Sequence, residues 1–176
     1  MPCGQGFFSY LFKKNGMNVY STDISEVAIS QAKTLYNGLN LFVADANNLP
    51  SDIGKFDLIF CRSCSLHNKL NFNIDNLITK KLLKFLKEGG RFIFCYNTNL
   101  SQAKKPGWVH HTVEDVRSHF HSINELANKE IYLINKVDTF VFRKFAYNRL
   151  LTKVNSHLLC RFKKHGDVIF TGIKLQ

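Results

Sequence analysis

The sequence lacks any long hydrophobic run. No stretch of about 18 consecutive apolar residues occurs, and this absence excludes a membrane-spanning helix by length. The N-terminus also lacks the order of an export signal, because its glycines precede a short apolar run and Lys13 and Lys14 follow that run. We therefore expect a soluble, cytoplasmic protein.

The sequence also lacks a cysteine framework. Its five cysteines are an odd number at scattered positions, namely Cys3, Cys61, Cys64, Cys95 and Cys160. Cys61 and Cys64 have CxxC spacing, but neither a second such pair nor a pair of histidines follows to complete a zinc site. These features indicate buried free thiols in a reducing compartment, with no metal site.

Apolar runs and helical patterns alternate along the 176 residues, of which 45% are hydrophobic. This alternation predicts one α/β domain over residues 1–176, with a parallel sheet and crossover helices. We expect Ser25 and Thr112 to cap helices, and Gly89 and Gly90 to end one. The expected strands are 18–22, 39–43, 56–61, 91–96, 123–134 and 168–175, and the expected helices are 7–15, 25–36, 74–87, 112–120 and 141–162.

A short glycine motif, Cys3-Gly4-Gln5-Gly6, stands just before the first expected helix. Glycines let the backbone approach a ligand closely, and the free N–H groups of a helix start are hydrogen-bond donors. The motif alone is also typical of a turn without a ligand. Ser9 occupies the position of the third glycine in the dinucleotide-binding fingerprint, so that fingerprint is incomplete.

Two carboxylates follow the next two strands. Asp23 lies nineteen residues after Gly4 at a strand end, where an acid can accept both hydroxyls of a ribose, although it could also simply cap a helix. This spacing fits a nicotinamide enzyme and a methyltransferase equally well. Asp45, after the following strand, can accept from the exocyclic amine of an adenine, and this second acid favours the methyltransferase.

In this order the motifs resemble the class I S-adenosylmethionine-dependent methyltransferases, and most closely their small-molecule branch. Pro2 to Gly6 matches the second half of that family's D-x-(G/P)-C-G-x-G loop, residues 56–63 match its fourth strand, and residues 86–92 match the turn into its fifth. The resemblance covers residues 2 to about 100. It implies a Rossmann-like, doubly wound, mostly parallel sheet with an antiparallel last strand.

The resemblance also implies a role for individual residues in binding S-adenosylmethionine and an acceptor. Asp23 would hold the ribose, and Asp45 would face the adenine amine. The other cofactor contacts would be Cys3, Gly4, Gln5, Gly6, Ile24, Ala46 and Cys61. The acceptor contacts would be Arg62, Ser63 and His110. If the acceptor needs a general base, His67 is the first candidate, followed by His110 and His111, although a histidine at such a position is more often an ordinary loop residue.

The chain departs from the family at its start. The acidic residue before Pro2 and the first, central strand of the sheet are missing. Losing about five buried apolar side chains would remove on the order of 10 kcal/mol, comparable to the whole stability of a domain. We therefore hypothesise that Met1 is an internal or miscalled start, which an in-frame stop directly upstream would contradict. An inactive remnant is accordingly one alternative to an active methyltransferase.

A basic amphipathic helical insertion is expected over residues 139–165. Its part from 142 to 164 carries Lys and Arg but no acidic residue, and the whole chain has a net charge of +11. The apolar side could dock on the core, or the segment could contact an anionic lipid or RNA. No aromatic-rich nucleic-acid motif and no Asn/Asp-Pro-Pro-aromatic signature occurs. A small-molecule acceptor is therefore the leading expectation, with an RNA methyltransferase as the alternative.

Overall fold

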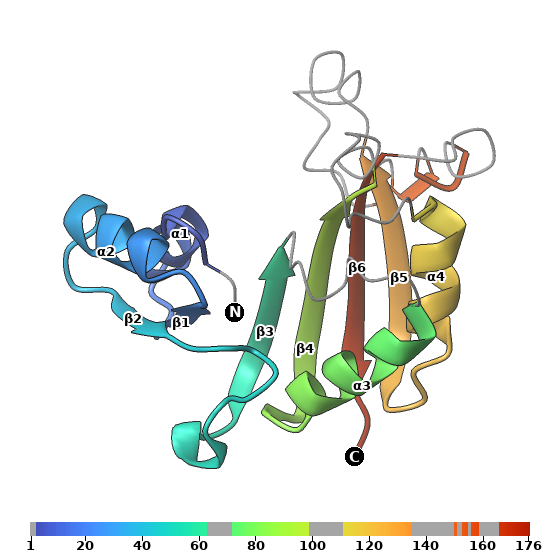
Figure 1. The fold of residues 1–176 in the computed structure, drawn as a ribbon. Helices are drawn as coiled ribbons and strands as arrows, with labels where there is room; N and C mark the ends of the chain where they lie inside the picture. The colour runs from blue at the N-terminus through green and yellow to red at the C-terminus, as the bar shows by residue number, and fades with distance from the viewer. Residues whose placement is uncertain are drawn as a thin grey trace. The chain divides into compact units, whose positions relative to one another are not determined.

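The computed structural model describes residues 3–62, 72–98, 111–134, 150, 153–154, 156–158 and 166–176. By its internal contacts the chain divides into two compact units, Met1–Lys55 and Phe56–Gln176, and each is described by itself. Figure 1 shows both units. The expectation of one domain over residues 1–176 stays a prediction.

The first unit is a two-stranded parallel sheet with two helices. Strands β1 and β2 pair with Tyr20 opposite Asn40 and Asp23 opposite Val43. The unit comprises α1 (Phe7–Lys14), β1 (Tyr20–Asp23), α2 (Glu26–Leu35), β2 (Asn40–Val43) and the short 3-10 helix η1 (Ser51–Ile53). Ser25 caps α2, because its Oγ accepts a hydrogen bond from the backbone N–H of Ala28 at 3.2 Å. The expected elements of this region are therefore confirmed to within two residues.

Ile29, Ala32 and Leu41 form a small core in this unit. They come from α2 and β2, and Cys3 and Leu39 pack against them. The helix buries Ile29 and Ala32 because residues three apart lie on the same face of a helix. This core holds α2 on the sheet.

The second unit is a four-stranded sheet in the order β3-β4-β6-β5. Strands β3 and β4 are parallel, whereas β6 is antiparallel to both of its neighbours. Helices α3 and α4 contact each other and cover one face of this sheet (Figure 1). The elements are β3 (Phe56–Arg62), α3 (Phe72–Leu83), β4 (Leu86–Asn97), α4 (Val113–His121), β5 (Leu126–Ile134) and β6 (Asp167–Lys174). The predicted α/β class, with an antiparallel last strand, is confirmed.

Aromatic side chains make the core of the second unit. Phe120 of α4 stacks on Phe170 of β6 with ring centroids 4.1 Å apart, and its ring also lies 4.9 Å from that of Phe94. Phe92, Phe94 and Phe120 are fully buried. Because alternate residues of a strand point to the same face, Phe92 and Phe94 of β4 both meet the helix.

Helix α4 begins at the expected cap. Thr112 and Asp115 form a capping box, in which Thr112 Oγ1 accepts from the N–H of Asp115 at 3.1 Å and Asp115 accepts from the N–H of Thr112 at 2.6 Å. This reciprocal pair satisfies two backbone donors at the helix start. The prediction that Thr112 caps this helix is confirmed.

The prediction that Gly89 and Gly90 end the helix before them is wrong. Helix α3 ends at Leu83, and both glycines lie in β4. The register between β3 and β4 shifts there, from Phe56 opposite Leu86 to Leu58 opposite Arg91, so the extra residues of β4 form a bulge. Gly89 has φ +71°, which the bulge requires and a side chain would disfavour.

Most of the expected helix over 141–162 lies outside the described residues. Residues 150, 153–154 and 156–158 are helical. The proposed insertion over 139–165 therefore stays a prediction. Among the residues that the structure places, no helix is both long and apolar enough to span a membrane.

We expect Phe120→Ala to destabilise the second unit by about 3–5 kcal/mol, because it empties the centre of the aromatic core. Phe7→Ala is the control, because Phe7 is 53% exposed and its truncation should change stability by less than about 1 kcal/mol. Urea unfolding followed by circular dichroism measures both. Equal losses in the two variants would contradict this description of the core.

Candidate functional site

The glycine loop is attached to the carboxyl end of β1. The backbone N–H of Cys3 donates to the carbonyl oxygen of Thr22 at 2.9 Å. The N–H of Gly4 donates to Oδ2 of Asp23, also at 2.9 Å. The loop then turns through a bond from the Gly6 N–H to the Cys3 carbonyl, and α1 follows. The first candidate motif and the first candidate acid are therefore in direct contact.

The two glycines of the loop have different structural roles. Both have positive φ, +51° at Gly4 and +82° at Gly6. A Cβ on Gly6 would lie 2.9 Å from Cβ of Ala32, so Gly6 allows the loop to pack closely against α2. A Cβ on Gly4 would meet no atom within 4 Å. The backbone at Gly4 therefore faces open space, where a ligand could approach it.

Asp23 joins the loop to the start of the next helix. Its Oδ2 accepts from Gly4, and its Oδ1 accepts from the N–H of Ser25 at 3.0 Å. A carboxylate offers about four acceptor positions, so these two bonds leave about two for a ligand. The structural and the ligand-binding interpretations of Asp23 are thus compatible.

Asp45 lies at the same edge of the small sheet. Its Oδ1 accepts from the backbone N–H of Asn47 at 2.9 Å and from the Asn47 side-chain amide at 3.2 Å. Both bonds leave Oδ2 available to accept. Because Asp23 is opposite Val43 in parallel strands and the Ala44 N–H donates to the Asp23 carbonyl at 3.0 Å, Asp45 follows closely on the same edge.

Three further candidate residues belong to this unit. Ile24, directly after Asp23, leaves 70% of its surface exposed, so its apolar side chain is accessible to a flat ring. Ala46 is half-buried beside Asp45. Gln5 is exposed, and its side-chain amide donates to that of Gln31 at 3.0 Å. The structure thus collects all the cofactor candidates except Cys61 around the loop and the two strand ends.

Helix α1 starts without a side-chain cap and has no acidic residue in its first turn. Gly6 precedes it as the N-cap residue. The first N–H groups of a helix carry a partial positive charge, so an uncapped start directly after the loop is suited to an anionic group such as a carboxylate.

A buried hydroxyl pair was not anticipated from the sequence. Ser9 of α1 and Ser21 of β1 are both buried, and their Oγ atoms lie 2.7 Å apart. Ser9, where the dinucleotide fingerprint would have a glycine, therefore binds the helix to the strand through a hydrogen bond. For Ser21, the sequence signal that could have indicated such a bond is a polar residue at a position of the expected strand that faces the core.

The remaining candidates belong to the second unit or lie outside the described residues. Cys61 is fully buried in β3, and Arg62 is exposed at the carboxyl end of that strand. His111 is buried, with its ring centroid 6.2 Å from that of Tyr96. Ser63, His67 and His110 lie outside the part of the chain that the structure describes, so their roles stay predictions.

Burial changes the acidity of two thiols. It raises the pKa of Cys3 above its ordinary value. It also raises the pKa of Cys95 to about 11, although the nearby Arg62 guanidinium acts in the opposite direction. Since the thiolate is the nucleophilic form, neither cysteine is activated for attack near neutral pH.

Sequence comparison matches the first part of the chain to a known family. The family model described as a methyltransferase domain matches residues 1–94, which is more than half of the 176 residues. No curated protein matches the chain significantly.

Several solved structures that are similar over nearly the whole chain are methyltransferases. Phosphoethanolamine N-methyltransferase 2 of Haemonchus contortus, in complex with S-adenosyl-L-methionine, is 16% identical with a TM-score of 0.68, over 99% of this chain and 47% of that one. A SAM-dependent methyltransferase from Archaeoglobus fulgidus is 17% identical with a TM-score of 0.65, over 98% and 83%. Magnesium protoporphyrin IX methyltransferase from Synechocystis PCC 6803, with bound SAM, is 17% identical with a TM-score of 0.59, over 98% and 67%.

These similarities concern the fold. The chain spans about half the length of the Haemonchus protein, 47% and 48% in two structures of it. At identities of 16–17% the likeness shows the shared architecture, and it confirms the Rossmann-like α/β class. The missing first strand stays a prediction.

We expect Cys95 to resist alkylation in the folded chain. Its raised pKa should let the rate with iodoacetamide keep rising above pH 9, where an ordinary thiol of pKa about 8.5 levels off. Mass spectrometry of the modified peptides, with urea-unfolded chain as the control, measures this rate. A folded rate that levels off like that of the unfolded chain would contradict the assignment.

Proposed function

The chain belongs to the methyltransferase domain family, and from this we propose that it transfers a methyl group from S-adenosylmethionine to a small-molecule acceptor. One observation carries the cofactor part of the proposal: the Asp23 carboxylate holds the Gly4 amide while keeping acceptor positions for a ligand, at the edge where Asp45 also lies. At this edge the two carboxylates would accept hydrogen bonds from the nucleoside, and the loop amides would donate to the amino-acid part.

We propose partners in the first unit for the ribose, the adenine and the methionine carboxylate of S-adenosylmethionine. The ribose hydroxyls would donate to Asp23, and the adenine amine would donate to Oδ2 of Asp45. The exposed side chain of Ile24 would cover one face of the adenine. The methionine carboxylate would meet the loop amides and the uncapped start of α1, where the helix dipole favours negative charge. Ala46 and Gln5 would border the site.

S-adenosylmethionine supplies an electrophilic methyl group on its sulfonium, and the chain's contribution is to hold the acceptor in line with it. Such positioning can supply about 7–11 kcal/mol of the barrier. From the family resemblance we also propose Cys61 as a cofactor contact, and Arg62, Ser63 and His110 as acceptor contacts. A phenol acceptor of pKa about 10 would cost about 4 kcal/mol to ionise at neutral pH, and His67 is the proposed base for that case.

The small-molecule acceptor is supported by two facts. Two of the similar structures are, by name, a phosphoethanolamine and a magnesium protoporphyrin IX methyltransferase. The sequence carries no recognition motif for nucleic acid bases. An RNA methyltransferase would instead bind RNA with a strong dependence on salt, because phosphate contacts release counterions.

We expect Gly4→Ala to weaken binding of S-adenosylhomocysteine by at least about tenfold, because the added methyl group projects into the space proposed for the ligand. Gly16→Ala is the matched control: Gly16 also has positive φ, +83°, and a Cβ there also meets no atom within 4 Å. Both variants therefore add backbone strain without a clash. Titration calorimetry measures the affinities, and equal affinities in the two variants would remove the loop from the site.

We expect Asp45→Asn to reduce the same affinity by about tenfold or more, because a hydrogen bond to a charged group contributes about 1.5–3 kcal/mol. Asn keeps the shape and the acceptor for Asn47. Asp23→Asn should lose as much and also loosen the loop. Asp52→Asn, in the exposed η1 helix, controls for the change in net charge. Unchanged calorimetric binding in both Asp23 and Asp45 variants would overturn the proposed site.

A further inference from the structure

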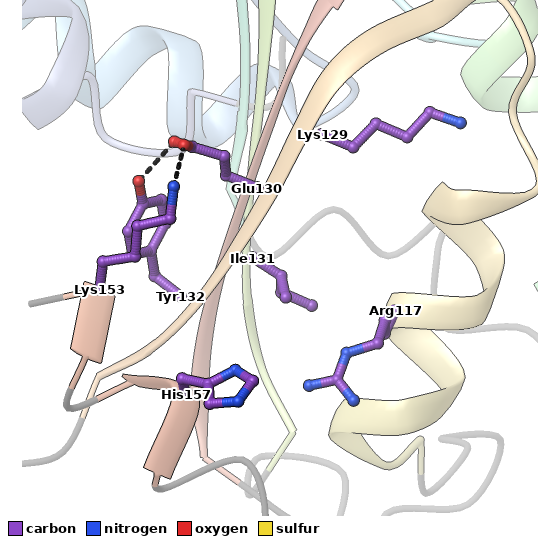
Figure 2. Close-up of a pocket in the computed structure, with 7 residues that line it drawn as sticks. All are labelled: Arg117, Lys129, Glu130, Ile131, Tyr132, Lys153 and His157. Atoms are coloured by element: carbon purple, nitrogen blue, oxygen red, sulfur yellow. Dashed lines mark hydrogen bonds and ion pairs between the residues drawn. The ribbon is translucent and has the colours of Figure 1, made fainter.

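A hollow of about 410 Å³ lies beside β5, an edge strand of the four-stranded sheet. We call it the β5 pocket. Side chains from β5 and from α4 line it, together with Lys153 and His157 (Figure 2). Three of its lining residues, Arg117, Lys129 and Lys153, are cationic, and one, Glu130, is acidic.

At one end of the β5 pocket, the negative charge of Glu130 is compensated by other residues of the pocket. Oε1 of Glu130 accepts from Nζ of Lys153 at 2.8 Å, and its Oε2 accepts from the hydroxyl of Tyr132 (Figure 2). Both oxygens of Glu130, the one acidic side chain among the described lining residues, are therefore engaged. This carboxylate is compensated within the pocket, so it opposes an incoming anion less than an unpaired acid would.

The other end of the β5 pocket has hydrogen-bond donors on two opposite sides. Arg117 and His157 point toward one another, and Ile131 of β5 lies above both in the view (Figure 2). Arg117 uses Nη1 to bind Glu114 at 2.6 Å, but a guanidinium has five N–H donors. An imidazole has at least one N–H donor in either protonation state. Lys129 adds positive charge, although its Nζ donates to the His121 carbonyl at 2.8 Å.

His157 is held in place by its neighbour. Ser156 is 2% exposed, and its Oγ accepts from the backbone N–H of Leu133 at 2.7 Å. This bond ties the helical residues 156–158 to the edge of β5. The donors facing each other across the β5 pocket therefore come from two elements that are both anchored to the same sheet.

We propose that the β5 pocket binds a phosphate monoester, held between Arg117 and His157. A phosphate presents oxygens around a tetrahedron, so donors on opposite sides can bind it at once, whereas the two oxygens of a carboxylate lie on one side. Arginine forms paired hydrogen bonds to phosphate, and the extra volume leaves room for the esterified group. The proposal goes beyond methyl transfer and uses none of the residues assigned to S-adenosylmethionine.

Apolar residues next to the β5 pocket help to distinguish a lipid phosphate from a soluble phosphate ester. Leu150, Val154 and Leu158 are 69%, 52% and 51% exposed. Their spacing of four positions is typical of an apolar face of a helix. A lipid with a phosphate monoester headgroup would engage both the β5 pocket and this apolar face. A soluble phosphate ester would engage the pocket alone.

The test is titration calorimetry of the full chain with glycerol 3-phosphate and with inorganic phosphate. We expect Arg117→Gln and His157→Ala each to weaken binding by about tenfold, since each removes one side of the clamp. Lys33→Gln, which removes an exposed cation from α2, should change it by less than about twofold. Acetate should bind at least about tenfold more weakly than phosphate. Thermal melting checks that each variant is folded.

Vesicle flotation distinguishes a lipid ligand from a soluble phosphate ester. If flotation with phosphatidylcholine vesicles requires phosphatidic acid, and if Arg117→Gln and Leu158→Asp abolish it, the ligand is a lipid. Binding of glycerol 3-phosphate without flotation indicates a soluble ester. The proposal is overturned if neither glycerol 3-phosphate nor inorganic phosphate binds at about 10 mM. It is also overturned if the Arg117 and His157 variants both bind these ligands as the wild type does. Binding of S-adenosylhomocysteine should be unchanged in these variants, which keeps the two proposals separable.

Discussion

The hydrogen bond from the Gly4 amide to the Asp23 carboxylate is the interaction on which the candidate site depends. It holds a loop with two left-handed glycines at the end of β1, and the same carboxylate also binds the start of α2 through Ser25. A charged acceptor makes each of these bonds stronger than a bond between neutral groups. One side chain therefore sets the loop, the helix start and the ligand acceptors at once.

The parallel arrangement of the strands explains why the other candidate acid is close by. The carboxyl ends of parallel strands meet at one edge of a sheet, so Asp45 follows β2 where Asp23 ends β1. In the second unit the antiparallel β6 plays a different role. It inserts between β4 and β5 and brings Phe170 against Phe120, so that α4 is fixed beside the edge strand where the β5 pocket lies.

The success and failure of the sequence predictions have local physical reasons. Ser25 and Thr112 were predictable as caps because capping is a short-range interaction between a side chain and backbone N–H groups a few residues away. Gly89 and Gly90 were misassigned because a glycine pair suits either a helix end or a bulge, and only pairing with β3 distinguishes the two. The hydroxyl pair of Ser9 and Ser21 likewise depends on which faces of α1 and β1 meet.

The sequence by itself determined the order of helices and strands and the identity of the residues at the strand ends, because periodicity, caps and strand length are local properties. It therefore predicted Asp23 and Asp45 as cofactor-binding acids at the ends of two neighbouring strands. Only the tertiary structure decided that the Gly4 amide binds Asp23, that Gly6 is needed for contact with Ala32, and that Arg117 faces His157 across a pocket. Those relations join residues far apart in the chain, and their geometry depends on how the elements pack.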